Sequence, residues 1–138
     1  MIKHFPITDT DKVCQHYSEK DGVPIKYVCT TELHHDDIPV DIFYRDTPHP
    51  EFGNKYFCLY VSKDDGLVIS NADKVDGLTF GMVEDDDGNM QYSQYHHDFK
   101  TFCNGNMIDG GRSYIRSTGK VAIYMVKDGE MKHESDNI

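Results

Sequence analysis

Six Asp-Gly pairs divide this 138-residue chain into short segments, and they constrain its fold more than any other feature. Glycine adopts positive φ at little cost, and Asp-Gly is favoured in the tight turns that join antiparallel strands. From residue 26 onward the segments are rich in Val, Ile, Tyr, Phe and Thr, which favour strands. The pattern predicts a meander of hairpins. The pairs stand at residues 21–22, 65–66, 76–77, 87–88, 109–110 and 128–129.

One helix is expected before the strands begin, over residues 8–20. Thr8 or Thr10 can cap it, and Asp9 and Asp11 are favourable near its positive end. The fold class expected is mostly β, a single antiparallel meander or sandwich-like domain with one short N-terminal helix. An α+β fold is the alternative.

Residues 47–54 interrupt the run of expected strands with two prolines. Proline cannot donate to a sheet ladder, so this segment should be a surface loop. The expected strands cover residues 26–31, 38–45, 55–62, 67–70, 78–84, 90–97, 112–117 and 121–127.

Charge and hydropathy limit the partners of the chain. It has 14 Lys and Arg against 24 Asp and Glu, a net charge of -10, which argues against direct binding of nucleic acid or an anionic membrane. No apolar run approaches the roughly 18 residues of a membrane span, so a cytoplasmic location is expected. The length suits one globular domain, expected over residues 1–131, with a frayed tail at 132–138. A homo-oligomer is compatible with these features.

The four cysteines predict no disulfide framework and no metal site. They contain no Cys-x-x-Cys pair, and an intracellular chain keeps its thiols reduced. Cys29 and Cys58 lie in apolar runs and should be buried; the other two are Cys14 and Cys103. No cofactor is expected.

Two polar segments invite a metal interpretation. Residues 84–89 are acidic, but the calcium-loop spacing would place Val83 and Gln94 at ligand positions, which favours a solvated hairpin turn. Residues 34–37, His-His-Asp-Asp, are expected to form a polar loop between strands. The histidines at 34, 35, 49, 96 and 97 still leave transition-metal binding open.

Residues 96–120 form a cationic segment in this acidic chain, with a net charge of +2 against -12 for the remainder. Arg112, Tyr114 and Arg116 alternate along an expected strand and so share one face. Two guanidinium groups beside an aromatic ring suit an anion attached to a planar base. A structural network, in which Asp98 or Asp109 pairs with the arginines, is the alternative. The candidate ligand-binding residues are His97, Asp98, Lys100, Asp109, Arg112, Tyr114 and Arg116.

The same region resembles a motif of short bacteriophage-encoded proteins, R-H-D-F followed by V-D-G-G-x-x-Y-x-R. The matching residues run from His97-Asp98-Phe99 to Ile108-Asp109-Gly110-Gly111-Arg112 and on to Tyr114 and Arg116, with His96 in place of the first Arg. The resemblance implies a phage origin and an accessory role that neutralises or redirects host machinery in the host cytoplasm.

Three functions follow as hypotheses. The first is a phage accessory protein, for counter-defence or host take-over, that captures a small anionic, nucleotide-like ligand. The second is an acidic inhibitor or nucleic-acid mimic that binds a host protein through its carboxylates. The third is a metal-dependent hydrolase or nuclease using His96, His97, Asp98 and Asp109. The chain contains no complete catalytic motif, so we favour a binding protein and name no catalytic residue.

Overall fold

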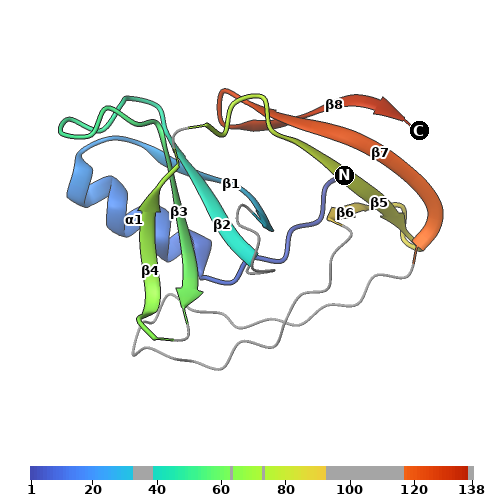
Figure 1. Cartoon of the computed structure of the whole chain (residues 1–138), viewed down its shortest axis with the longest axis horizontal. Helices are drawn as coiled ribbons and strands as arrows, with labels where there is room; N and C mark the ends of the chain where they lie inside the picture. The colour runs from blue at the N-terminus through green and yellow to red at the C-terminus, as the bar shows by residue number, and fades with distance from the viewer. Residues whose placement is uncertain (33–38, 63, 73, 93–116, 137–138) are drawn as a thin grey trace.

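The fold is two four-stranded antiparallel sheets and one helix, in a computed structural model that describes residues 1–32, 39–62, 64–72, 74–92 and 117–136 (Figure 1). The expected mostly β class with one short helix is confirmed. The N-terminal sheet has the strand order β1-β2-β3-β4, and the C-terminal sheet has the order β6-β5-β7-β8. The elements are α1 (Thr10–Asp21), β1 (Ile25–Glu32), β2 (Pro39–Arg45), β3 (Tyr56–Ser62), β4 (Gly66–Asn71), β5 (Thr79–Asp85), β6 (Met90–Tyr92), β7 (Ser117–Lys127) and β8 (Glu130–Asp136). None of the described helices is long and apolar enough to cross a membrane.

Asp9 caps the helix, in place of Thr8 or Thr10. Its side chain accepts a hydrogen bond from the Lys12 amide at 3.2 Å, while Thr8 turns inward to a buried carboxylate. The helix ends at Gly22, whose φ of 71° lets its amide reach the Ser18 carbonyl at 2.9 Å. The Asp-Gly pair at 21–22 therefore ends a helix and does not form a hairpin turn.

Three of the other Asp-Gly pairs lie in hairpin connections, as expected. They join β3 to β4, β5 to β6 and β7 to β8. In the last of these turns Asp128 and Gly129 both have positive φ, 51° and 77°, as a two-residue primed turn requires. The pair at 76–77 lies in a turn before β5, and the pair at 109–110 lies outside the described residues.

Strand β2 of the N-terminal sheet is covered on both faces. All seven residues of β2 are buried, and alternate side chains enter different cores. Ile42 and Tyr44 pack in a core shared with the C-terminal sheet, where they meet Phe80, Met82 and Val126. The order of layers is therefore helix, sheet, sheet.

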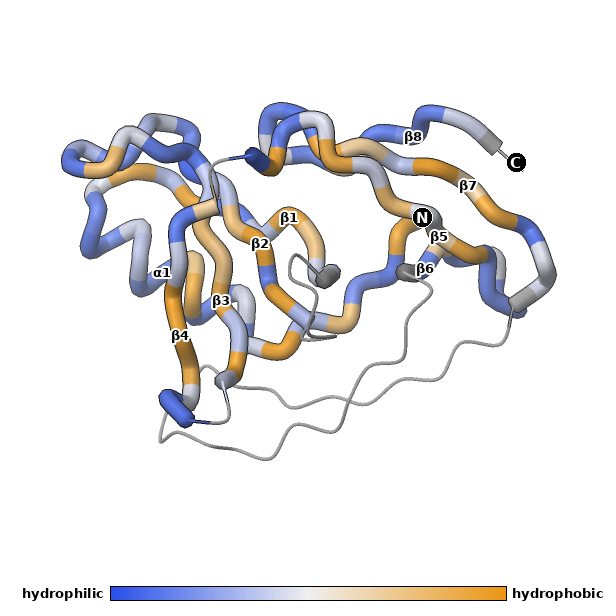
Figure 2. Tube along the Cα trace, viewed as in Figure 1, coloured by the Kyte–Doolittle hydropathy of each residue, from blue (hydrophilic) through white to orange (hydrophobic). Residues whose placement is uncertain are grey.

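The helix side of the N-terminal sheet has its own core. Phe43 and Phe57, neighbours on β2 and β3, stack with centroids 5.1 Å apart, and Val13 of α1 packs against them. Figure 2 shows hydrophobic residues continuing along β3 and β4. The two prolines keep residues 46–55 out of the sheets, as expected for a loop between β2 and β3.

A polar contact joins the two sheets. The Tyr56 hydroxyl, on β3, donates to Asp76 and accepts from the Gly129 amide at 2.9 Å. The Asp128 amide donates to the same Asp76 carboxylate at 3.0 Å. The β7–β8 turn is thereby fixed against the N-terminal sheet.

The C-terminal residues correct the expectation of a frayed tail at 132–138. Residues 132–136 belong to β8, an edge strand whose backbone groups on the β7 side are hydrogen-bonded to β7. Met131 and His133, two residues apart on β8, also make side-chain contacts. Met131 packs against the inter-sheet core, and the His133 ring lies 5.3 Å from that of Tyr124. Of the expected strand at 90–97 only β6 is described, and the expected strand at 112–117 is described only from Ser117, where β7 begins.

We expect Gly129→Ala to destabilise the fold more than the matched change Gly88→Ala. Both glycines have positive φ, 77° and 85°, so each alanine carries a backbone cost of about 1 kcal/mol. Only at 129 would the new Cβ lie 2.5 Å from Tyr44 Cδ2, and relieving that overlap adds about 1–3 kcal/mol. Urea unfolding of both variants measures the difference, and equal losses would contradict this packing.

Candidate functional site

The seven residues proposed from sequence as a ligand site lie outside the described residues. They are His97, Asp98, Lys100, Asp109, Arg112, Tyr114 and Arg116. The site they would form therefore stays a prediction. The described residues contain a different pocket with related chemistry, which we call the Arg45 pocket.

The Arg45 pocket lies on the helix side of the N-terminal sheet and has a volume of about 310 Å³. Its walls come from the end of α1, from the β2–β3 loop and from β4. The lining residues are Tyr17, Lys20, Asp21, Arg45, His49, Phe52, Ile69, Ser70 and Asn71. A second cavity, between the sheets beside His4 and Cys29, has a volume of only about 10 Å³, which is room for one water molecule.

The pocket exists because the helix does not cover the whole sheet. β4 residues Ile69 and Asn71 pair with Leu59 and Phe57 of β3, so their side chains lie on the same face as the helix-side core. Leu59 and Phe57 are fully covered, whereas Ile69 is 45% exposed. The edge strand thus leaves an open floor beside the helix.

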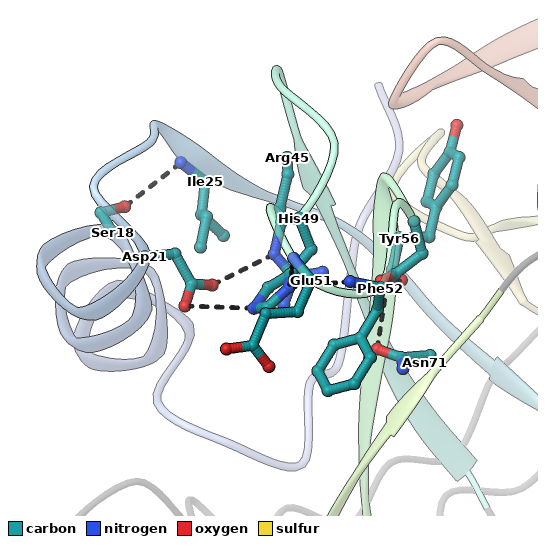
Figure 3. A network of polar contacts seen from close by, with 10 residues as sticks. Ser18, Asp21, Ile25, Arg45, His49, Glu51, Phe52, Tyr56 and Asn71 are labelled. Carbon is teal, nitrogen blue, oxygen red and sulfur yellow. Dashed lines mark hydrogen bonds and ion pairs between the residues drawn. The ribbon is translucent and has the colours of Figure 1, made fainter.

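Arg45 forms the inner end of the pocket. Arg45 is only 3% exposed. Its Nε donates a hydrogen bond to Asp21 Oδ2 at 3.1 Å, and its guanidinium carbon lies 4.4 Å from the Phe57 ring centroid. Figure 3 shows Asp21, on the last turn of α1, reaching toward both Arg45 and His49. One guanidinium nitrogen, Nη1, is buried and has no hydrogen-bond partner among the described residues. A buried donor without a partner costs about 1–3 kcal/mol, and more when it is charged.

His49 organises the outer wall. Its Nδ1 accepts hydrogen bonds from the Glu51 and Phe52 amides at 3.1 and 3.3 Å, so the neutral ring carries its proton on Nε2. That nitrogen faces Asp21 Oδ1 at 3.8 Å. The Phe52 ring stacks on the imidazole with centroids 4.7 Å apart. These contacts tie the turn at residues 50–52 to the His49 ring.

The pocket is locally cationic. Lys20 and Arg45 contribute two positive charges against one from Asp21, in a chain whose net charge is -10. Sequence analysis missed this site because Arg45 reads as the polar end of a strand, and its partner Asp21 is 24 residues away. A single arginine at the end of an apolar run was the available signal.

The other proposed metal and thiol features have structural roles where they are described. Asp85, in the acidic hairpin, accepts hydrogen bonds from the Asn89 amide at 2.9 Å and from the Asp87 amide at 3.0 Å, and these bonds lower the pKa of its carboxyl. Burial raises the pKa of Cys29 to about 12 and that of Cys58 to about 11, and both thiols are free. The segment 34–37 and Cys103 lie outside the described residues.

Asp41 is a second charged residue on buried β2, and it is fully buried. Its carboxylate accepts hydrogen bonds from the Ile7 and Thr8 amides at 3.0 and 2.9 Å and from the hydroxyls of Thr8 and Thr30. Burial raises the pKa of this carboxyl to about 6, and the hydrogen bonds offset part of the rise. Asp41 therefore anchors the segment before α1 and titrates in a mildly acidic range.

We expect the Asp41 contribution to the free energy of unfolding to decrease between pH 4 and pH 6. The folded carboxyl, with a pKa of about 6, holds a proton that the unfolded carboxyl, at 3.8, has released. The stabilisation is complete below the lower value and lost above the higher one, a span of roughly 3 kcal/mol. Asp41→Asn cannot titrate and should show a shallower decrease in urea unfolding from pH 4 to 7. A carboxyl-carbon NMR titration of Asp41 with a midpoint near 4 would contradict this expectation.

The groups around Arg45 suit binding more than bond-breaking chemistry. The Ser70 hydroxyl donates to the Asn71 carbonyl and His49 Nδ1 is engaged by its own loop, so the two are not arranged as nucleophile and base. Among the described residues no three His, Cys, Asp or Glu side chains cluster as metal ligands. In comparisons with known proteins, no family, no curated protein and no solved structure matched the chain. We therefore infer function from the pocket's own geometry.

Proposed function

We propose that this protein captures a small anionic ligand in the Arg45 pocket. The observation that carries the proposal is the buried Nη1 of Arg45, which has no partner among the described residues, in a side chain that lines a pocket of about 310 Å³. An anion supplies the missing acceptor, and charge-assisted hydrogen bonds to guanidinium are among the strongest in proteins. Binding an anion thus offsets the cost of leaving this buried donor without a partner.

The size and charge of the pocket support the same conclusion. Small-molecule sites have volumes of about 300–1,000 Å³, so this one suits a compact ligand. Lys20 at the exposed rim and Arg45 at the buried end give a net charge of +1 with Asp21. An otherwise acidic surface repels anions, so a local cationic pocket selects where one binds.

The biological setting remains the one that the sequence resemblance implies. We place ligand capture in an accessory protein of a bacteriophage, and a nucleotide-like host signal is one of the anions to be tested. The Arg112 cluster is a separate proposed anion site.

The acidic-mimic hypothesis has a narrower structural basis. Asp64, Asp65, Asp86 and Asp87 are exposed at two hairpin turns, where they could meet a basic host protein. Asp85 is buried and bonded within its own loop, so it adds no free carboxylate to such a surface. We favour the pocket because it contains an unmet bonding requirement.

Thermal unfolding in the presence of AMP, inorganic phosphate and 2-naphthoate tests the proposal, with adenosine and 2-naphthamide as neutral controls. We expect at least one anion to stabilise the protein, by about 2.7 kcal/mol at a hundred times its Kd. The double variant Arg45→Gln/Asp21→Asn replaces the ion pair by a neutral pair. It should weaken binding of that ligand at least about tenfold, because a charge-assisted bond contributes roughly 1.5–3 kcal/mol.

Two variants of exposed lysines on the same helix provide the matched control. Lys20→Gln removes a charge from the pocket rim and should weaken binding severalfold, whereas Lys12→Gln removes the same charge outside the pocket and should not. Equal losses of affinity in the two variants would show that the anion responds to the overall charge of the helix, which would contradict binding in the pocket. Failure of all three anions to stabilise the wild-type protein would refute the proposal.

A further inference from the structure

Two large, exposed apolar side chains line the Arg45 pocket. Phe52 is 64% exposed and Ile69 is 45% exposed, and in the described part of the chain the other exposed large hydrophobic residue is Met1. Both line the pocket that ends at Arg45. Apolar side chains gathered at a cavity, unlike scattered ones, mark a binding surface. The ligand should therefore have an apolar part as well as a charge.

The Phe52 ring is held as a platform. Its stacking on His49, at an interplanar angle of 26°, covers one face of the ring. The exposure of Phe52 leaves the opposite face for a ligand. Figure 3 shows the Phe52 ring projecting beside Asn71 of β4, at the sheet side of the pocket. A flat ring fits this arrangement because offset stacking adds to the area buried.

The inner end favours a single negative charge. The Arg45 guanidinium already pairs through Nε with Asp21, so Asp21 would lie near any anion bound to the same group. An aryl phosphate carries about -1.5 to -2 at pH 7, and a second negative charge is repelled by Asp21. A carboxylate carries one charge and matches the planar edge of guanidinium. Because Nη1 is buried, the side chains around it must move before a carboxylate can bond to it.

We infer that the ligand of the Arg45 pocket is a planar aromatic monocarboxylate, an inference that rests on the proposed function. The carboxylate bonds to Arg45 at the buried end, with Lys20 at the rim. The ring lies over Ile69 and against the free face of Phe52. The pocket then recognises a negative charge at its buried end and a planar ring at its exposed end.

Calorimetric titration of four probes tests this assignment. The probes are 2-naphthoate, 2-naphthyl phosphate with the same ring and a larger charge, 2-naphthamide with no charge, and cyclohexanecarboxylate with no flat ring. We expect 2-naphthoate to bind at least about tenfold more tightly than each of the others, because each lacks one of the two matched features.

Substitutions of Phe52 separate stacking from simple hydrophobic contact, and its exposure makes them safe for folding. Phe52→Ala should weaken 2-naphthoate about tenfold, Phe52→Leu should weaken it less, and Phe52→Tyr should retain binding. Cyclohexanecarboxylate should respond equally weakly to all three. Melting temperatures close to that of the wild type show that the fold is intact.

The outcomes distinguish this inference from the proposed function. Preferential binding of 2-naphthyl phosphate or AMP, with loss in the Arg45→Gln and Asp21→Asn pair, would overturn the carboxylate assignment and keep anion capture. Equal binding of cyclohexanecarboxylate and 2-naphthoate would overturn the aromatic assignment. Binding of none of the anions would remove both.

Discussion

Complete burial of β2 is the constraint on which the rest of the structure depends. The strand lies between the helix-side core and the inter-sheet core, yet two of its seven residues, Asp41 and Arg45, are charged. A buried charge is tolerated only when other groups bond to it. Asp41 meets this requirement through the segment before α1, and Arg45 meets it through Asp21 at the end of α1. The two charges therefore tie both ends of the helix to the sheet.

The parts of the fold that sequence predicts are those set by local chemistry. Asp-Gly turns depend on backbone preferences of two residues, so the turns at 65–66, 87–88 and 128–129 could be identified without knowledge of the core. The cap at Asp9 could not, because Thr8 is used by Asp41, 33 residues away. Strand β8 was missed for a similar reason. Its sequence is polar and shows little apolar pattern. The strand is stabilised by backbone pairing with β7, which does not depend on the burial of its side chains.

The candidate site is harder to predict because its defining interactions are long-range. Arg45 becomes a pocket residue only when the helix end, the β2–β3 loop and the β4 edge meet. Sequence reasoning predicted an anion site in which arginines flank an aromatic ring, at Arg112, Tyr114 and Arg116, and that site stays a prediction. The general preference for arginine beside a ring reappears at Arg45 and Phe57. The location of such a pair depends on tertiary packing that residue types alone do not encode.

Stability alone does not explain the buried pair of Arg45 and Asp21. The free energy needed to desolvate two charges can equal or exceed the free energy of their attraction. Replacing a buried ion pair by well-packed apolar residues therefore often leaves a protein equally stable or more stable. Here the net free energy of the ion pair is less favourable still, because Nη1 has no described partner and Lys20 adds positive charge at the pocket rim. A buried guanidinium that lines a pocket and lacks one hydrogen-bond acceptor is what the proposed anion site requires. The same guanidinium that holds the helix to the sheet is thereby the group best placed to receive a ligand.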